Sequence, residues 1–251
     1  MAQQKGILPV QGTIGNLTFY KSKDGYLVRE KGGIDAKRMA SDPAFQRTRE
    51  NGAEFGRAGK AGKVLRNSLR ALTQNASDSK MVSRLTKEMM RVIKADQVNP
   101  RGQRNVIDGE AELLQEFEFN INGKLGATLY APYTAAIDRV TGILSVDLPA
   151  FVPANMVAAP GGATHFRINS AGVEVDFEGN HYVTDTNSTA EIPIDNALTA
   201  AVSLSNTVPA NSTHPLFLVL GVDFFQEINQ SMYPLKNGAF NALCLVKVSG
   251  I

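Results

Sequence analysis

The chain has 251 residues, of which 43% are hydrophobic and 20% are charged, so it can bury a sizeable core and lacks the composition of a disordered protein. Its single cysteine, Cys244, excludes a disulfide framework within one chain. The formal net charge of +2 conceals a division: residues 1–107 hold 21 Lys and Arg against 9 Asp and Glu (+12), whereas residues 108–251 hold 5 against 15 (−10).

The first twelve residues, MAQQKGILPVQG, contain no long apolar stretch of the kind found in a signal peptide. No later run approaches the ~20 apolar residues that span a membrane. We therefore expect synthesis in the cytoplasm without a conventional signal peptide, and no membrane span. The final location stays open, extracellular assembly included.

Two β-prone runs, Thr13–Lys21 and Tyr26–Glu30, predict a β-hairpin. The dipeptide Asp24-Gly25 between them favours a type I′ turn, because both central positions of that turn need positive φ. An isolated hairpin is only marginally stable, so this one must pack on its own domain or pair with the sheet of a neighbouring molecule. Aromatic residues beside the turn favour cross-strand packing over stacking on nucleic-acid bases. The expected contact residues of the hairpin are Tyr20, Asp24, Gly25 and Tyr26.

The dipeptide Asp42-Pro43 predicts the start of a long helix that continues to about Leu72. Four glycines spaced three or four residues apart lie on one face of this helix. Each costs about 1 kcal/mol relative to alanine, so we interpret the face as a smooth surface on which another backbone packs closely. The alternative is that the helix breaks near its first or last glycine. The glycines are Gly52, Gly56, Gly59 and Gly62.

Five basic residues recur every three or four positions along the same segment: Arg57, Lys60, Lys63, Arg66 and Arg70. This basic stripe can contact the phosphates of a nucleic acid or the acidic half of a neighbouring molecule, and a solvated helix face is the third interpretation. A P-loop is excluded, because neither Gly59-Lys60 nor Gly62-Lys63 is followed by Ser or Thr.

A second helix begins after Ser77 or Asp78, either of which can cap it. Its apolar stripe, which predicts ordinary core packing, comprises Val82, Leu85, Met89, Val92 and Ile93. The loop that follows carries Arg101 and Arg104, which we expect to be mobile and which add to the basic region.

From Ala111 onward the hydrophobic pattern alternates, in runs such as LLQEFEFNI, GILSVDL, VEVDF and TAEIPI. About eight to ten short strands separated by turn residues are typical of an antiparallel β-sandwich. The runs 217–225 and 242–248 are the most apolar and are expected to be central strands. The carboxylates at alternate positions, for example Glu116, Glu174 and Asp176, are expected on a solvated sheet face.

The sequence contains no recognisable catalytic pattern. His165, His181 and His214 have no metal-ligand spacing, and no GxSxG nucleophile motif is present. Cys244 lies in an apolar run without a nearby histidine, so we interpret it as a core residue. We therefore expect no catalytic residues, no metal and no cofactor.

Three segments together resemble an uncharacterised family of bacterial proteins of about this length. They are GTIGNLTFYKSKDGYLVRE, DPAFQRTRENGAEFGRAGKAGKVLR and PLFLVLGVDFFQEINQSMYPLKNGAFNALCLVKV. The resemblance covers most of the chain and implies a bacterial protein made in the cytoplasm. It carries no catalytic or binding residues.

We expect an α+β fold: a basic amino-terminal region of β-hairpin plus two helices (1–107) and an acidic carboxyl-terminal antiparallel β-sandwich (108–251). The leading hypothesis is a non-enzymatic, self-assembling structural protein, a subunit of a filament, tube, shell or phage-like particle. Its complementary charged halves favour a homo-oligomer or polymer, although they can equally neutralise each other within one molecule. The alternatives are a nucleic-acid-binding protein that uses the basic residues between 57 and 70, and a β-sandwich enzyme or lectin.

Overall fold

The computed structural model describes residues 2–6, 8–22, 25–30 and 33–251, with the side chains at 236 and 237 excepted. The chain divides into two compact units, an amino-terminal unit (Met1–Arg49) and a main unit (Glu50–Ile251). The boundary predicted at 107/108 falls inside the main unit. The expected α+β class is confirmed, because helices and antiparallel sheets occur together.

The amino-terminal unit is a small antiparallel sheet followed by two short helices. The sheet has the strand order β1-β4-β3-β2. Its strands are β1 (Ala2–Gln3), β2 (Gly12–Ile14), β3 (Leu17–Ser22) and β4 (Gly25–Glu30). The predicted hairpin is therefore the central pair, β3 and β4, and a short strand flanks it on each side. Two helices follow, α1 (Ala36–Ser41) and η1 (Pro43–Phe45).

The predicted long helix is α2 (Gln46–Ser68), which is continuous through all four glycines. Asp42 caps the η1 turn that precedes α2, and its side chain accepts a hydrogen bond from the Ala44 N–H. The helix ends earlier than expected, because Leu69 leaves helical geometry and α3 (Arg70–Thr73) starts anew. The alternative of a break near Gly52 or Gly62 is wrong.

The second predicted helix is α4 (Met81–Ala95). Its buried residues are Met81, Leu85, Met89, Val92 and Ile93. The predicted stripe is thus confirmed except at Val82, which is 46% exposed. Asp78 does not cap α4 directly; its carboxylate accepts hydrogen bonds from the Lys80 and Ile121 N–H groups and pairs with Arg84.

The main unit contains two antiparallel sheets. The larger has the order β12-β11-β7-β8, with β13 also paired to β11 and β9 to β7, and the smaller has the order β10-β6-β5. The strands are β5 (Thr134–Asp138), β6 (Ile143–Leu148), β7 (His165–Asp176), β8 (His181–Ser188), β9 (Ile192–Pro193), β10 (Val202–Thr207), β11 (Leu216–Ile228), β12 (Ser231–Pro234) and β13 (Ala242–Ser249). Short helical turns connect them: η2 (Ala111–Leu114), α5 (Leu125–Thr128), α6 (Pro153–Met156) and η3 (Leu235–Gly238).

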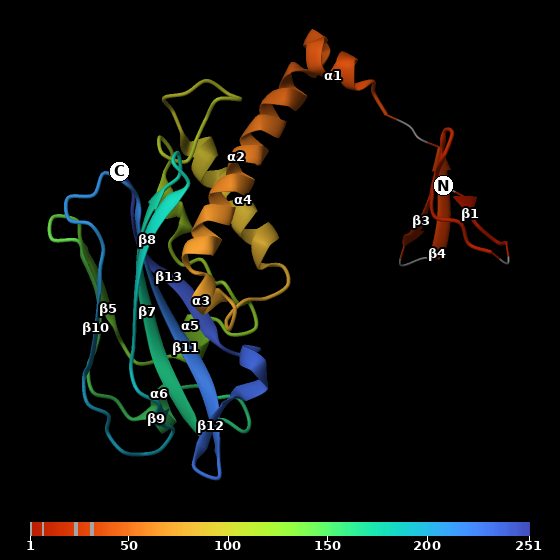
Figure 1. Ribbon diagram of the computed structural model, residues 1–251. Helices are drawn as coiled ribbons and strands as arrows, with labels where there is room; N and C mark the ends of the chain where they lie inside the picture. The colour runs from red at the N-terminus through yellow and green to blue at the C-terminus, as the bar shows by residue number, and fades with distance from the viewer. Residues whose placement is uncertain (1, 7, 23–24, 31–32) are drawn as a thin grey trace. The chain divides into compact units, whose positions relative to one another are not determined.

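The larger sheet is covered on both faces (Figure 1). Phe217 and Val219 of β11 share one core cluster with α2 and α4. Leu218 and Leu220, which point the other way, share the second cluster with the smaller sheet. The two sheets approach closely at Gly172, where an added Cβ would lie 2.8 Å from the Asn206 Cβ. Helices and sheets therefore form one body in which β11 is central.

Three expectations about the β region are wrong. The run LLQEFEFNI forms η2 and then an irregular segment, because Glu116 adopts φ 66° and breaks the alternation. This segment still covers the edge of β13, through hydrogen bonds such as Phe119 N–H to the Leu243 carbonyl (2.8 Å). The run TAEIPI contributes only the two-residue β9. Glu174 is buried, not solvated, and accepts a hydrogen bond from Ser212 Oγ at 2.5 Å.

Candidate assembly surfaces

One face of the amino-terminal sheet is apolar. Directly paired residues of antiparallel strands share a face, and the register pairs Phe19 with Val28, Lys21 with Tyr26, and Leu17 with both Ile14 and Glu30. We call the apolar members of this set the apolar sheet face: Ile14, Leu17, Phe19, Tyr26 and Val28.

The opposite face of this sheet is more polar. It carries Thr18, Tyr20 and Arg29, and the Arg29 guanidinium lies 5.4 Å from the Tyr20 ring centroid. The two tyrosines expected to act together therefore lie on opposite faces. Gly25 has φ 108°, in the positive region that the predicted turn requires, whereas Asp24 lies outside the described residues.

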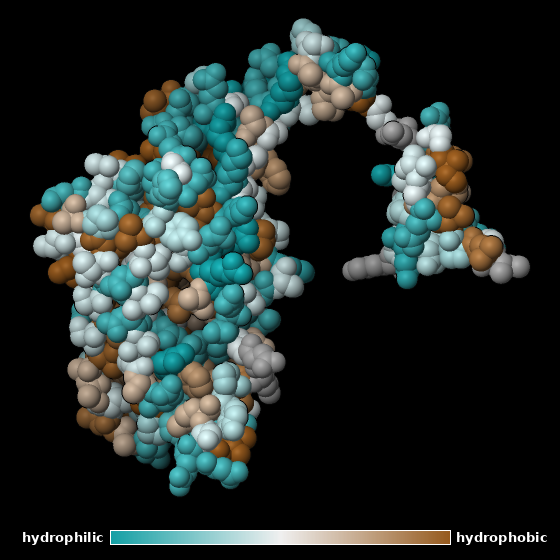
Figure 2. Space-filling view, viewed as in Figure 1, coloured by the Kyte–Doolittle hydropathy of each residue, from teal (hydrophilic) through white to brown (hydrophobic). Residues whose placement is uncertain are grey.

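The described residues of the amino-terminal unit cover the apolar sheet face only in part, because Phe19, Tyr26 and Val28 are half-buried and the outer members stay exposed. None of the described residues between 2 and 49 is buried, and Ile14 and Leu17 are 64% and 45% exposed. Figure 2 shows hydrophobic residues gathered along one side of this unit. Ordering a residue costs about 1–2 kcal/mol of conformational entropy, and a small sheet without a core has little to offset that cost. The described part of the unit therefore buries little apolar surface of its own.

Three of the four predicted glycines form an open surface on α2. A Cβ built at Gly52, Gly56 or Gly59 meets no atom of the described residues within 4 Å. Gly62 differs, because it is buried and its Cβ would lie 3.7 Å from Leu85 Cγ. With about 3.6 residues per turn, Lys63 continues the line of the open glycines. We call Gly52, Gly56 and Gly59 the open glycine face.

The basic residues of α2 serve two purposes. Arg57 donates to the carbonyl oxygens of Gly102 (2.8 Å) and Arg104 (3.0 Å), and Arg66 donates to the Gly62 carbonyl, so both hold the fold. Lys60, Lys63 and Arg70 are exposed and make no ion pair among the residues that the structure describes. The free charge of the stripe thus comes from three of its five members.

Helix α4 carries a second basic stripe, which the sequence reading missed. Its members recur at helical spacing and comprise the N-cap residue Lys80 and four residues within the helix: Arg84, Lys87, Arg91 and Lys94. Arg84 pairs with Asp78 and Arg91 with Glu88. The signal was present in the sequence as a basic residue every three or four positions opposite the apolar stripe.

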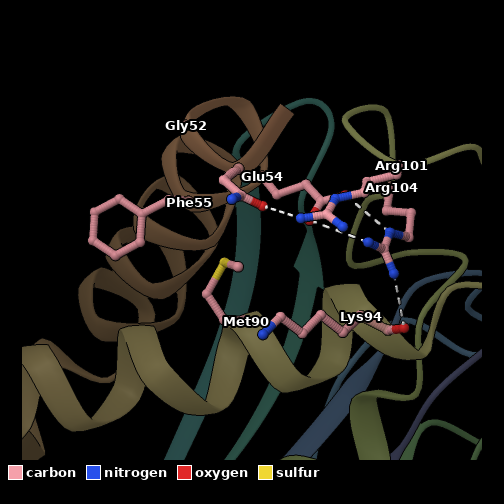
Figure 3. Close-up of a pocket in the computed structure, with 8 residues that line it drawn as sticks. Gly52, Glu54, Phe55, Met90, Lys94, Arg101 and Arg104 are labelled. Atoms are coloured by element: carbon pink, nitrogen blue, oxygen red, sulfur yellow. Dashed lines mark hydrogen bonds and ion pairs between the residues drawn. The ribbon is translucent and has the colours of Figure 1, made fainter. Parts of the chain in front are cut away.

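A hollow of about 690 Å³ lies between the start of α2 and the end of α4. It is lined by Asn51, Gly52, Glu54, Phe55, Met90, Lys94, Arg101 and Arg104. Figure 3 shows Glu54 and Arg104 pointing toward each other, whereas the Phe55 ring points away from them. Phe55 is 61% exposed, so an aromatic ring stands at the edge of the open glycine face.

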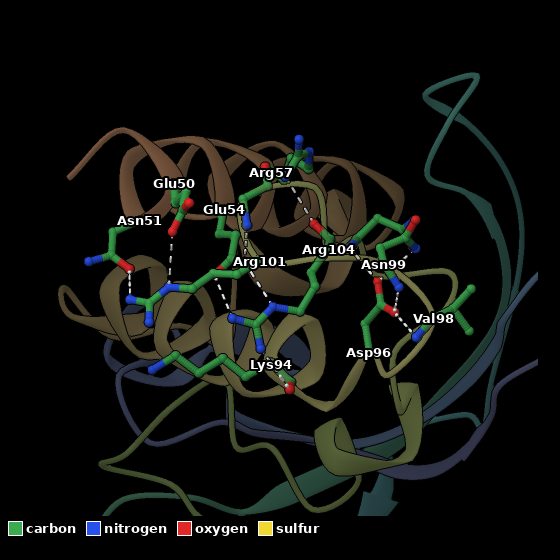
Figure 4. Close-up of polar contacts among 12 residues, drawn as sticks. Glu50, Asn51, Glu54, Arg57, Lys94, Asp96, Val98, Asn99, Arg101 and Arg104 are labelled. Atoms are coloured by element: carbon green, nitrogen blue, oxygen red, sulfur yellow. Dashed lines mark hydrogen bonds and ion pairs between the residues drawn. The ribbon is translucent and has the colours of Figure 1, made fainter. Parts of the chain in front are cut away.

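The loop after α4 is fixed by charge, and the expectation that Arg101 and Arg104 are mobile is wrong. Glu54 is 1% exposed and accepts hydrogen bonds from the Gly102 N–H (2.8 Å) and Arg104 Nε (2.9 Å) (Figure 4). Arg101 donates to Asn51 Oδ1 at 2.7 Å. Burial raises the pKa of Glu54, but the hydrogen bonds from Gly102 and Arg104 outweigh burial and hold its pKa below the ordinary value.

Within the described part of the chain, no three His, Cys, Asp or Glu side chains are placed to hold a metal ion. No described helix is both long and apolar enough to cross a membrane. Cys244 is buried, as expected of a core residue, and burial together with the nearby Glu118 carboxylate raises the pKa of its thiol. No family model matches the chain, and no curated protein or solved structure matches it.

The openness of the glycine face predicts that Gly56→Ala raises the free energy of unfolding by about 0.5–1 kcal/mol, because the helix gains propensity and the new methyl group meets no neighbour. Urea unfolding followed by circular dichroism measures this change. A destabilised Gly56→Ala protein would show that the face is covered within the monomer.

The Glu54 contacts predict that Glu54→Gln lowers the free energy of unfolding at pH 7 by about 2–3 kcal/mol, because Arg104 loses its charged partner. The pKa of Glu54 is lower in the folded protein, so its stabilisation is complete above the unfolded value of about 4.3 and is lost as the pH falls through the folded value. The difference in the free energy of unfolding between the wild-type protein and Glu54→Gln should therefore decrease as the pH is lowered below about 4. The matched control is Glu88→Gln, which removes an exposed pair with Arg91 and should cost less than about 1 kcal/mol. If Glu54→Gln and Glu88→Gln lowered the free energy of unfolding equally at pH 7, the stabilising role of the Glu54–Arg104 pair would be contradicted.

Proposed function

We propose that the protein is a non-enzymatic structural subunit that assembles with copies of itself into a filament, tube, shell or phage-like particle. The observation that supports this most directly is the amino-terminal sheet, whose apolar face is only partly covered and whose unit has no buried residue among those described. Such a unit is completed by another surface.

Charge favours a partner surface on another copy's main unit. The amino-terminal unit holds 9 Lys and Arg against 4 Asp and Glu (+5), and the main unit holds 17 against 20 (−3). Two amino-terminal units repel each other, whereas an amino-terminal unit and a main unit attract. A contact between two different surfaces continues from copy to copy unless it closes into a ring.

The helical side of the main unit offers a second contact. The open glycine face allows a neighbouring backbone to approach α2, and Phe55 adds an exposed aromatic anchor. Lys60 and Lys63 lie beside this face and suit an acidic neighbour. We further propose that the two sheets of the main unit act together as a rigid β-sandwich that carries both contacts.

Assembly is tested with the full chain by negative-stain electron microscopy and light scattering at low and high salt. We expect regular polymers or rings that high salt dissolves, because salt screens the attraction between the units. Phe19→Asp places a charge on the apolar sheet face and should abolish assembly. Thr18→Asp, which alters the opposite face of the same strand, should leave assembly intact.

A monodisperse monomer of the wild-type protein under all of these conditions would refute the proposed function. Equal loss of assembly in both variants would show that the charge, rather than the apolar sheet face, is responsible.

Nucleic-acid binding is the second candidate function. The supporting observation is that six cations on and beside α2 and α4 have no carboxylate partner among the described residues: Lys60 and Lys63 on α2, Arg70 on α3, Lys80 just before α4, and Lys87 and Lys94 on α4. Such free cations can replace the counterions of a phosphate backbone.

This candidate predicts that binding of a short DNA duplex weakens steeply with salt and that Lys60→Glu/Lys63→Glu/Arg70→Glu lowers the affinity at least about tenfold. Fluorescence anisotropy measures both effects. The matched control is Lys247→Glu on β13, away from both helices, and normal DNA binding by the triple variant would rule the candidate out.

A further inference from the structure

The smaller sheet carries a hollow of about 440 Å³ on its exposed face. It lies at the end of the sheet where β6 ends and where β5 and β10 begin. Its rim includes Pro132 and Pro149, whose rings fix φ and so limit movement of the backbone there. Apolar residues make up most of its lining and a few polar side chains stand among them, which is the usual composition of a small-molecule site.

Three oxygen-bearing side chains line the hollow in a row across the sheet. Asp147 of β6 is paired directly with Thr134 of β5 and with Ser203 of β10, so all three project from the same face. Ser203 Oγ donates to Asp147 Oδ1 at 2.6 Å. Among the described residues, Asp147 Oδ2 and the Thr134 hydroxyl have no hydrogen-bond partner, and both side chains are exposed. A carboxylate oxygen that accepts and hydroxyls that both donate and accept are therefore available to a ligand.

The charge of the hollow favours an uncharged ligand. No Lys, Arg or His is among the described residues that line it, so an anionic ligand would meet only the repulsion of Asp147. A cationic ligand would meet a single exposed carboxylate, and an ion pair at such a position contributes little free energy. A neutral molecule with several hydroxyl groups can use the carboxylate and both hydroxyls of the row as hydrogen-bond partners.

Tyr133 adds an aromatic side chain to the same hollow. The residue is 37% exposed and lies next to Thr134 at the start of β5. Burial, together with the nearby Cys244 thiol and the Glu118 and Glu116 carboxylates, raises the pKa of Tyr133, so its hydroxyl group lies near those groups and stays protonated. An aromatic ring beside polar groups suits a ligand that has one apolar and one polar surface.

We propose that this hollow binds one ring of a neutral saccharide. A pyranose carries hydroxyl groups around its edge and C–H groups on its faces. Its hydroxyl groups bond to Asp147 Oδ2 and to the Thr134 hydroxyl, while a C–H face lies against the Tyr133 ring. The Ser203 hydroxyl directs its proton to Asp147 and accepts a further hydrogen bond from the sugar.

The site is one for binding and not for hydrolysis. Asp147 is the single carboxylate among the described residues that line the hollow, whereas glycoside hydrolysis generally uses a pair of carboxyl groups. The inference gives the lectin alternative raised by the sequence a defined location on the smaller sheet. It goes beyond the proposed assembly and does not depend on it, because every residue of the hollow belongs to one copy of the main unit.

The first test titrates the full chain with glucose, galactose, mannose, N-acetylglucosamine, cellobiose and lactose, and follows binding by saturation-transfer difference NMR. We expect at least one of these sugars to bind with a Kd on the order of 1 mM, because each hydrogen bond to the sugar replaces one to water and contributes little net free energy. Choline is the cationic probe. If none of the six sugars binds, or if choline binds in their place, the inference is overturned.

The second test locates the bound sugar with variants whose fold is checked by circular dichroism. Asp147→Ala and Tyr133→Ala should each raise the Kd at least about tenfold, since they remove the carboxylate and the ring. Tyr133→Phe keeps the ring and should bind like the wild-type protein. The matched control is Ser205→Ala, on the same strand and face as Ser203 but outside the hollow, which should leave the Kd unchanged.

Sugar binding that is unaffected by both Asp147→Ala and Tyr133→Ala would place the sugar elsewhere and overturn the inference. Light scattering of the same variants reports assembly separately, so a failure of sugar binding and a failure of the proposed function are distinguished.

Discussion

The main unit depends on one constraint: strand β11 is apolar on both faces. Its alternate side chains, Phe217 and Val219 on one side and Leu218 and Leu220 on the other, must all leave water. One face is covered by α2 and α4 and the other by the smaller sheet, so three layers are required. The segment after η2 then covers the edge of β13, through bonds such as Phe119 N–H to the Leu243 carbonyl. The buried pairing of Glu54 with Arg104 holds the loop between α4 and this segment against α2.

The amino-terminal sheet lacks the feature that stabilises the main unit. Its hydrogen bonds are formed and its register is regular, yet none of its described apolar side chains is buried: Phe19, Tyr26 and Val28 are half-buried, and Ile14 and Leu17 are exposed. Hydrogen bonds contribute little net stability when water is the competing partner. Burial of apolar area contributes more, and here further burial can come from outside the unit. The contrast between a three-layered unit and a single, partly covered layer is the physical basis for proposing an assembly role.

Much of the fold follows from period and turn chemistry, and the misses have physical causes. The 3.6-residue period predicted α4 correctly because its stripe, Leu85, Met89, Val92 and Ile93, is deeply buried. Alternation predicted β6 and β7, and the apolar run 217–225 predicted β11. Alternation failed for LLQEFEFNI, since the positive φ of Glu116 cannot be inferred from residue type. Of the candidate site, the glycines and the hairpin were visible in the sequence. Two features could not be predicted from the sequence. Gly62 faces the core, and Arg101 and Arg104 are held in place by hydrogen bonds to Asn51 and Glu54.

The open glycine face and the partly covered sheet share a thermodynamic property. Each interior glycine weakens α2 by about 1 kcal/mol, and Gly52, Gly56 and Gly59 have no neighbour in the described monomer that would require them. The apolar sheet face likewise forgoes stabilisation in the monomer. Both costs fall on the isolated chain and both are offset when another surface arrives. A chain built only for stability as a monomer would place alanine at these helix positions and polar side chains on this sheet. The proposed assembly would account for both departures at once, whereas phosphate binding by α2 and α4 would account for their cations and leave the apolar sheet face without a partner.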